Sequence, residues 1–293
     1  MDLHHRPVLL RETMEQLQPA AGGIYVDGNL GFGGHSAAIL ENSAPDGVVI
    51  GFDVDPAALE YAGQRLAPFG HRIRCVRRNF AEMASVLHGM GIAAVQGILL
   101  DLGLSSFQLD ASGRGFSFQG DEPLDMRMDP SRNTTAADLV NTLSRDELAD
   151  ILYYYGEERQ ARRIASFVVE ERQHGAIRST GQLAGIIERA VPRRFHPPKI
   201  HMATRSFQAL RIAVNNEMEN LAQALVAGAD LLAPGGRFCV ISFHSLEDRL
   251  VKNSFKEHRE LQVLTRKPVV PTEEEVRQNP RARSAKLRVA EKR

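Results

Sequence analysis

Short apolar runs alternate with helical stretches over the first hundred residues. The runs at residues 23–27 (GIYVD), 47–53 (GVVIGFD), 72–76 (RIRCV) and 97–101 (GILLD) have the length and composition of strands. The segment between the second and third, residues 56–66 (PAALEYAGQRL), has Pro in its first turn followed by Ala, Leu and Glu, which is typical of a helix. Strands that alternate with helices predict right-handed crossovers and a parallel sheet covered on both faces.

This alternation of predicted strands and helices ends after the fourth apolar run. From about residue 105 to residue 204 the β-branched runs disappear, and short helical segments separated by turns replace them. Two capping boxes mark helix starts there, Ser144 with Glu147 and Ser179 with Gln182. We therefore expect a mostly helical insertion at residues 105–204.

The alternation resumes near residue 206. Apolar residues then recur at steps of three and four, which predicts one long helix with a single apolar face. Its members are Phe207, Leu210, Val214, Met218, Leu221, Leu225, Ala229 and Leu232. A Pro-Gly-Gly stop precedes a fifth strand at residues 237–243, and residues 285–289 (AKLRV) predict a last strand at the sheet edge.

These patterns predict an α/β fold. We expect a Rossmann-like sheet domain formed by residues 1–104 and 205–293, interrupted by the helical insertion at residues 105–204.

Composition and charge narrow the class of protein. No apolar run approaches the length of a bilayer span, and no secretory leader is visible. Two cysteines are too few for a disulfide framework, and both lie in predicted strands, so we read them as small buried hydrophobes. The expectation is a cytoplasmic protein without a membrane association.

Basic residues are clustered although the net charge is zero. The segment 156–211 has 11 Lys and Arg against 5 Asp and Glu, and residues 277–293 have 7 against 1. Such clusters suit a phosphate backbone, although solvated helix faces are the alternative. Six residues of the insertion are candidates for contacting such a backbone: Arg159, Arg162, Arg163, Arg193, Arg194 and Lys199.

A glycine-rich turn follows the first strand, in the segment 26–36 (VDGNLGFGGHS). Glycine is needed where the chain turns sharply or approaches a ligand, and such turns bind nucleotides in doubly wound sheets. The turn begins with an acid and lacks the G-x-G-x-x-G spacing of dinucleotide sites. It therefore favours a ligand without a pyrophosphate, such as S-adenosylmethionine.

Polar or aromatic residues follow the next three strands. Asp53 ends the second strand, where a carboxylate can accept hydrogen bonds from ribose hydroxyls, or can simply cap the following turn. Phe80 follows the third strand and can pack on adenine or belong to the core. Asp101 ends the fourth strand, beside the expected position of a transferable group. Because the carboxyl ends of parallel strands meet at one edge of a sheet, these residues should share a crevice.

Longer blocks extend the evidence along nearly the whole chain. They are HRPVLLRE from His5, GGIYVDGNLGFGGHS from Gly22, ILLDLGLSSFQLD from Ile98, RGFSF from Arg114, PLDMRMD from Pro123, YGEER from Tyr155, FQALRIAVNNE from Phe207, GGRFCVISFHSLEDR from Gly235 and NPRARSAKLR from Asn279. With these blocks the chain closely resembles the ribosomal RNA small-subunit methyltransferase H (MraW) family.

The resemblance implies a chemistry and its partners. The family's enzymes use S-adenosyl-L-methionine to methylate the N4 amine of a cytidine in the decoding region of 16S ribosomal RNA. The substrate can be either naked RNA or the assembled small subunit, and the protein can be either a monomer or a homodimer. We expect no metal site, because the His and Asp residues are scattered and the two cysteines are far apart, without metal-ligand spacing.

The family's cofactor contacts transfer where residues match. The matching residues are Gly33, Gly34, His35, Asp53, Phe80, Asp101 and Gln108. Three positions depart from the family's usual residue, namely Asn29 for Thr, Phe107 for Pro and Met202 for Pro. The change at Phe107 puts the path of its loop, and so the contact of Gln108, in doubt.

The expected chemistry needs hydrogen-bond acceptors against the target amine. Asp101 and the following Ser105 and Ser106 are the candidates, and no cysteine lies near their loop to attack a pyrimidine ring. His244, after the fifth strand, is either structural or at the crevice. Two other classes stay open: a DNA cytosine-N4 methyltransferase, whose S-P-P-Y-like or D-P-P-Y-like loop is missing here, and a non-catalytic ribosome-assembly protein that binds RNA.

Overall fold

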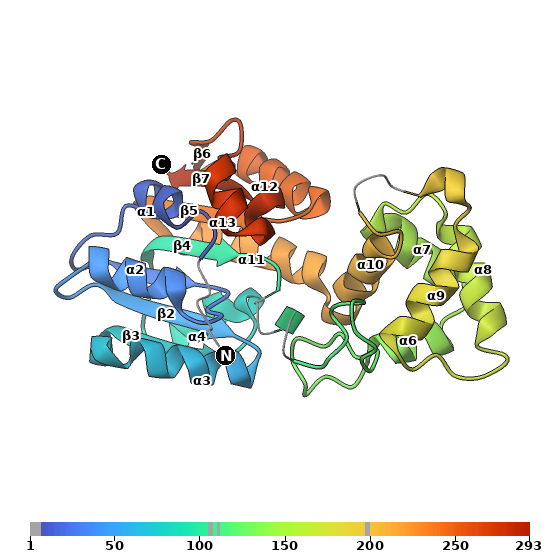
Figure 1. Cartoon of the computed structure of the whole chain (residues 1–293). Helices are drawn as coiled ribbons and strands as arrows, with labels where there is room; N and C mark the ends of the chain where they lie inside the picture. Colours follow the sequence, from blue (N-terminus) through green and yellow to red (C-terminus); the bar gives the residue numbers. More distant parts are fainter. Residues whose placement is uncertain (1–6, 105–107, 110–111, 197–199) are drawn as a thin grey trace. The chain divides into compact units, whose positions relative to one another are not determined.

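The protein was analysed as a computed structural model that describes residues 7–104, 108–109, 112–196 and 200–293. The chain divides into a sheet unit, residues Met1–Gly103 with Met218–Arg293, and a helical unit, residues Leu104–Glu217 (Figure 1). Our predicted boundary after residue 204 differs from this division. The reason is that α10 (Thr204–Asn215) packs against α7 (Arg145–Gly156) of the helical unit.

The sheet unit contains a seven-stranded sheet in the order β3-β2-β1-β4-β5-β7-β6. Its strands are β1 (Ile24–Asp27), β2 (Val48–Asp53), β3 (Ile73–Arg77), β4 (Val95–Asp101), β5 (Leu232–Ser242), β6 (Leu261–Val263) and β7 (Lys286–Lys292). The first five pair in parallel, which confirms the predicted Rossmann-like sheet. Strands β2 and β3 are added on one side of β1, and β4 and β5 on the other, so the topological switch point lies between β1 and β4. Open α/β sheets bind ligands at the carboxyl ends of the strands at such a point.

Helices cover both faces of this sheet, which explains why its strands are apolar on both sides. One face packs against α1 (Leu10–Leu17), α2 (Gly34–Asn42) and α3 (Pro56–Leu66). The other packs against α4 (Met83–Gly89), α11 (Glu217–Leu231) and α12 (Ser245–Glu257). The remaining elements of the unit are α13 (Glu273–Gln278) and the 3-10 turns η1 (Ala67–Arg72), η2 (Phe80–Glu82) and η4 (Pro280–Ser284).

Two predictions about this region are wrong. The predicted long helix is two helices, α10 and α11, because Asn216 between them adopts a left-handed conformation with φ of 52°. The predicted edge strand near the C-terminus, β7, instead lies inside the sheet, antiparallel to both β5 and β6. The short β6 pairs with only one strand and takes the edge position, which the apolar pattern of β7 alone could not reveal.

The helical unit is built from α6 (Ala136–Thr142), α7, α8 (Ala161–Glu171), α9 (Thr180–Ala190) and α10, with the turn η3 (Arg193–Phe195). Both predicted capping boxes are confirmed. The hydroxyls of Ser144 and Ser179 accept hydrogen bonds from the backbone N–H groups of Glu147 and Gln182, whose side chains return the bond. Each box satisfies N–H groups that the first turn leaves unpaired.

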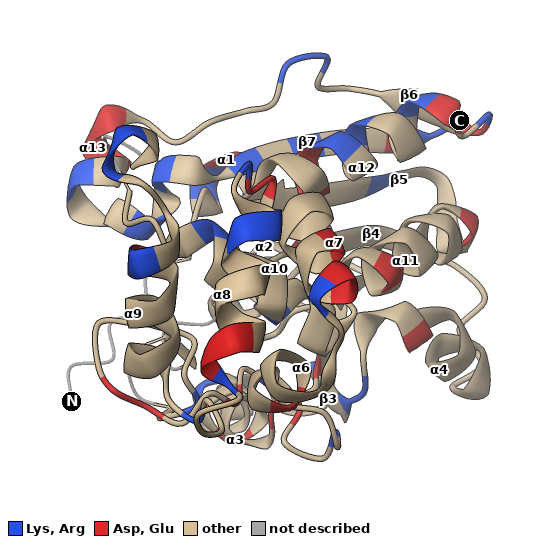
Figure 2. Cartoon of the chain, turned by 90° about the vertical axis from the view of Figure 1, so that its right-hand side faces the viewer, with Lys and Arg blue, Asp and Glu red and all other residues tan. Residues whose placement is uncertain are grey.

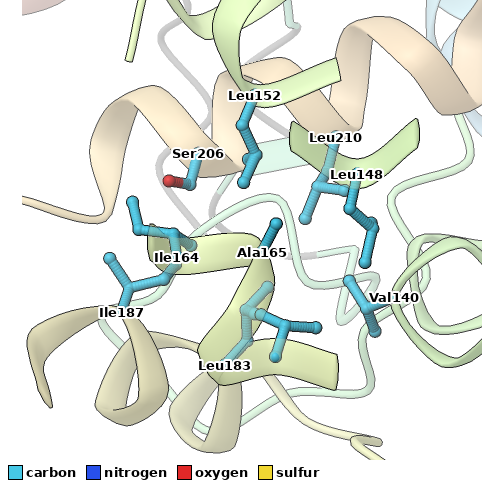
Figure 3. Close-up of a pocket in the computed structure, with 10 residues that line it drawn as sticks. Val140, Leu148, Leu152, Ile164, Ala165, Leu183, Ile187, Ser206 and Leu210 are labelled. Carbon is cyan, nitrogen blue, oxygen red and sulfur yellow. The ribbon is translucent and has the colours of Figure 1, made fainter. Parts of the chain in front are cut away.

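A small cavity lies in the core of the helical unit (Figure 3). Apolar side chains from α6 to α10, among them Leu152, Ile164 and Leu183, form its wall. Ser206 contributes a buried hydroxyl that has no hydrogen-bond partner among the described residues. The cavity has a volume of about 10 Å³, which is room for one water molecule and not for a cofactor.

None of the described helices combines the length and the apolar character that are needed to cross a bilayer.

Candidate cofactor site

The glycine-rich turn joins β1 to α2 through two left-handed residues. Gly31 has φ of 50° and Gly33 has φ of 74°, a region that side chains with a Cβ disfavour. A Cβ at Gly33 would also lie 2.9 Å from Leu66 Cδ1. Gly33 is the N-cap of α2 and has no side chain to cap it. The first N–H groups of α2 therefore form a positive end that suits a ligand carboxylate.

Asp27, at the end of β1, holds this turn in place. Its side chain is buried, and it accepts hydrogen bonds from Ser36 Oγ at 2.7 Å and from the N–H of Asn29 at 3.3 Å. Burial raises the pKa of Asp27 to about 6, against the lowering by these two hydrogen bonds. The sequence pattern did not single out Asp27 as a site residue, although its position at the start of the glycine-rich turn was the available signal.

Asp53 lies at the end of β2 with part of its side chain exposed. Oδ2 accepts from the N–H of Gly31 at 2.9 Å, and Oδ1 accepts from the N–H of Asp55 at 2.9 Å. A carboxylate has about four acceptor positions, so each oxygen keeps one for a ligand. This is the arrangement that a vicinal diol requires. Burial raises the pKa of Asp53 to about 6, so the group is charged at neutral pH.

Phe80 begins η2 directly after β3, where the side chain of Asn79 caps the turn. A Cβ at Gly28 would lie 3.1 Å from Phe80 Cβ, so Phe80 lies against the start of the glycine-rich turn. Phe80 also packs against the apolar cluster on the α4 side of the sheet while staying partly exposed. The ring can therefore belong to the core and still offer a surface to a base.

His35 and Asp101 form a pair at the switch point. His35, in the first turn of α2, is buried, and its Nδ1 lies 3.4 Å from Asp101 Oδ2 at the end of β4. Its other ring nitrogen, Nε2, lies 3.1 Å from the carbonyl oxygen of Val8. Burial, followed by the nearby carboxylates of Asp27 and Glu247, raises the pKa of Asp101 well above its usual value. Asp101 is therefore an unusually basic carboxylate.

Six predicted site residues thus come together on the sheet unit: Gly33, Gly34, His35, Asp53, Phe80 and Asp101. Gln108 belongs to the helical unit, where its side chain is buried. Ser105, Ser106 and the departure at Phe107 lie outside the described residues.

His244 and Cys239 have structural roles, as a helix cap and as part of the buried sheet. His244 is the N-cap of α12, where its ring accepts from the N–H of Glu247 at 3.3 Å and Glu247 returns a bond to its backbone. Cys239 is buried in β5, and burial raises the pKa of its thiol to about 12. The prediction that both cysteines are buried is wrong for Cys75, which is exposed because β3 is an edge strand.

The residues present fit S-adenosyl-L-methionine. Asn29 Oδ1 and Asp101 Oδ1 are buried acceptors without a partner among the described residues, and such atoms commonly mark ligand positions. The carboxylates of Asp53 and Asp101 suit a ribose and a cation, and the bare N-terminus of α2 suits a carboxylate. The fold and this site together define a nucleoside-cofactor enzyme of the doubly wound class.

The chain belongs to the MraW methylase family, whose model matches residues 2–293. It is a methyltransferase that depends on S-adenosyl-L-methionine. It is 55% identical over 288 residues to "Ribosomal RNA small subunit methyltransferase H" of Desulfotalea psychrophila, with 98% of each chain covered. It is 54% identical to the protein of the same name from Geobacter sulfurreducens, with 100% of each covered.

A solved rRNA methylase from Streptococcus thermophilus is more distantly similar. It aligns with 12% identity and a TM-score of 0.42 over 97% of this chain and 93% of its own.

Proposed function

We propose that the protein transfers the methyl group of S-adenosyl-L-methionine to the N4 amine of a cytidine in small-subunit ribosomal RNA. The names of the relatives support the ribosomal RNA as substrate. The observation that carries the choice of atom is Asp101, a basic carboxylate at the end of β4 whose Oδ1 lacks a partner among the described residues. An amine nucleophile needs such an acceptor, because it must lose a proton.

Each site residue has a proposed role toward the cofactor. Gly33 and Gly34 allow the backbone to approach it, and the N–H groups that begin α2 bind its carboxylate. Asp53 accepts from the ribose hydroxyls, and Phe80 packs on the adenine. We also assign cofactor contacts to His35, Asp101 and Gln108, and acceptor roles near the amine to Ser105 and Ser106.

The bound cofactor supplies an electrophilic methyl group on a sulfonium. The protein's part is mostly positioning, because the exocyclic amine of cytosine is a weak nucleophile whose lone pair is delocalised into the ring. Asp101 orients that lone pair by accepting a hydrogen bond from the amine, and it takes the proton that the amine loses as the N–C bond forms.

The position of the methyl group tests this proposal. We expect N4-methylcytidine as the product, and we expect Cys75→Ser/Cys239→Ser to retain activity because neither cysteine is placed for attack on C6 of the base. Small subunits from cells that lack the enzyme are treated with protein and labelled cofactor, and their nucleosides are identified by mass spectrometry after nuclease digestion. 5-Methylcytidine, or a folded but inactive double variant, would contradict the proposal.

The helical unit is the proposed RNA-binding part. Arg159, Arg162 and Arg193 are exposed and make no ion pair with a described residue, whereas Arg163 donates to the carbonyl of Ala190 and is therefore occupied. Basic and acidic segments both occur on this unit (Figure 2). We therefore expect RNA to contact only the basic segments and not the whole surface of the unit. Lys199 lies outside the described residues.

Exposed aromatic rings add a second kind of contact. Tyr153 and Tyr154 on α7 are 57% and 63% exposed, with ring centroids 5.2 Å apart, whereas Tyr155 packs on the core. Arg194 lies over the exposed ring of Phe195 at 4.8 Å. Exposed rings of this kind stack on unpaired bases, which supports single-stranded or opened RNA as the substrate.

We expect Arg159→Ala/Arg162→Ala/Arg193→Ala to weaken RNA binding and to flatten its salt dependence. Each lost phosphate contact should reduce the slope of log K against log salt by about 0.7 to 0.9. Filter binding to small-subunit RNA over a salt series measures the slope. The matched control is Arg65→Ala/Arg259→Ala/Arg266→Ala, which removes three exposed charges from the sheet unit. Equal slopes for the two variants would assign the effect to net charge alone.

The alternatives differ in their outcomes. A DNA cytosine-N4 methyltransferase would label DNA and not small subunits, and a non-catalytic assembly protein would bind RNA without transferring label. A ribosomal substrate also supports a cytoplasmic location. A homodimer stays a prediction for sedimentation to test.

A further inference from the structure

Asp101 holds a proton of its own firmly, so it cannot by itself take up a second one during turnover. Burial of the carboxyl group, followed by the negative charges of Asp27 on β1 and Glu247 on α12, raises the pKa of Asp101 and so favours its protonated form. An acid that is already protonated cannot accept the proton of an amine. The site therefore needs a second group that can take a proton from Asp101. His35 can do so, because its Nδ1 lies 3.4 Å from Asp101 Oδ2.

We infer that His35 is a positioning residue that holds a proton for Asp101 during methyl transfer. This inference rests on the proposed function and deepens it. In the resting pair, one proton lies between Asp101 Oδ2 and His35 Nδ1. As the bond between the amine nitrogen and the methyl carbon forms and the bond from carbon to sulfur breaks, the amine proton passes to the Asp101 carboxylate. The pair then ends as a carboxylic acid beside an imidazolium.

The charge balance of the site favours this assignment. The reaction turns a sulfonium into a neutral thioether, so one positive charge disappears from the crevice and one appears on the pair. The negative groups Asp27 and Glu247 stabilise that new cation. The carbonyl oxygen of Val8, 3.1 Å from Nε2, accepts the second ring N–H of the imidazolium.

The distance of 3.4 Å between Nδ1 and Oδ2 is long for a hydrogen bond. Catalytic hydrogen bonds are commonly long in the free enzyme and shorten when the ligands bind. The buried ring of His35, fixed at its far nitrogen by Val8, already points its other nitrogen at the carboxylate.

NMR of the free protein tests the pair without any reaction. With ¹⁵N-labelled histidine, the ring signals of His35 are followed against pH in the wild type and in Asp101→Asn. We expect the titration of His35 to move by about one pH unit or more toward lower pH in the variant, because the carboxylate that stabilises the imidazolium is lost. The exposed His88 serves as the internal reference. An unmoved His35 titration would overturn the inference.

Kinetics then separate proton holding from a structural role. In His35→Gln the amide can still donate to the carbonyl of Val8, but it cannot take a proton. We expect the single-turnover rate at saturating cofactor to fall by about 10² or more, and calorimetry measures separately any loss of cofactor affinity, since His35 is also a proposed cofactor contact. The pH–rate profile should reduce from a coupled pair of ionisations to one. His88→Gln is the matched control.

Either a wild-type pH–rate profile in His35→Gln or a loss confined to cofactor affinity would sink the inference. If this variant does not fold, the NMR result on Asp101→Asn decides. The two proposals fail separately: a product other than N4-methylcytidine would contradict the proposed function, whereas the coupling of His35 to Asp101 is measured in the free protein.

Discussion

Asp101→Asn should lose most of the methyltransferase activity while the protein stays folded. The substitution keeps the shape of the side chain and one acceptor oxygen, but it removes the base that takes the amine proton. General-base catalysis contributes typically about 10²–10⁴-fold, so the single-turnover rate should fall within that range. Transfer of tritium from labelled cofactor to small subunits measures it, with the cofactor in saturating amounts.

Saturation matters because Asp101 is also a proposed cofactor contact. Calorimetry on the same variant gives the affinity for cofactor separately, and a loss of transfer that persists at saturation belongs to the chemical step. The matched control is Asp230→Asn, since Asp230 is an exposed carboxylate on α11 of the same unit. Transfer near the wild-type rate in Asp101→Asn would remove the carboxylate from the chemistry.

Asp53→Ala should weaken cofactor binding by at least about tenfold, since hydrogen bonds to a charged group contribute roughly 1.5–3 kcal/mol. The loss has two sources in the structure. The ribose loses its acceptors, and the N–H groups of Gly31 and Asp55 lose the carboxylate that orders the turn. Asp53→Asn keeps one acceptor oxygen, so its affinity should lie between those of the wild type and Asp53→Ala.

The raised pKa of Asp53, about 6, adds a pH test with a definite sign. The charged carboxylate accepts more hydrogen bonds than the acid, so the ligand prefers the charged form. Cofactor affinity should therefore fall as the pH drops below about 6, and this fall should be smaller in both Asp53 variants. Calorimetry at about pH 5 and about pH 7.5 measures the difference in affinity. Equal affinities for all three proteins would remove Asp53 from the site.

Local patterns predicted the parts of the fold that depend on nearby residues. The four apolar runs became β1 to β4, and the two capping boxes formed as expected, because a strand's burial and a helix's first turn are encoded within a few residues. The position of Asp53, Phe80 and Asp101 near the carboxyl ends of neighbouring strands was predicted by the same reasoning, since topology fixes where those ends lie.

Other features depend on partners that are distant in the sequence. The position of β7 between β5 and β6, and the exposure of Cys75 on the edge strand β3, follow from strand order, which no local pattern states. The break at Asn216 was hidden because the apolar spacing continues through it. The apolar spacing is consistent with one helix, but the structure has two, α10 and α11.

The sequence by itself determined the family, the sheet and the carboxylates of the site. Only the tertiary structure decided which groups surround those carboxylates and how basic they are. It brought the buried His35 from α2 within 3.4 Å of the partly buried Asp101 on β4, near Asp27. The basicity of Asp101 comes from burial and from neighbouring negative charge, and both arise only when segments that are remote along the chain meet in a medium of low dielectric constant.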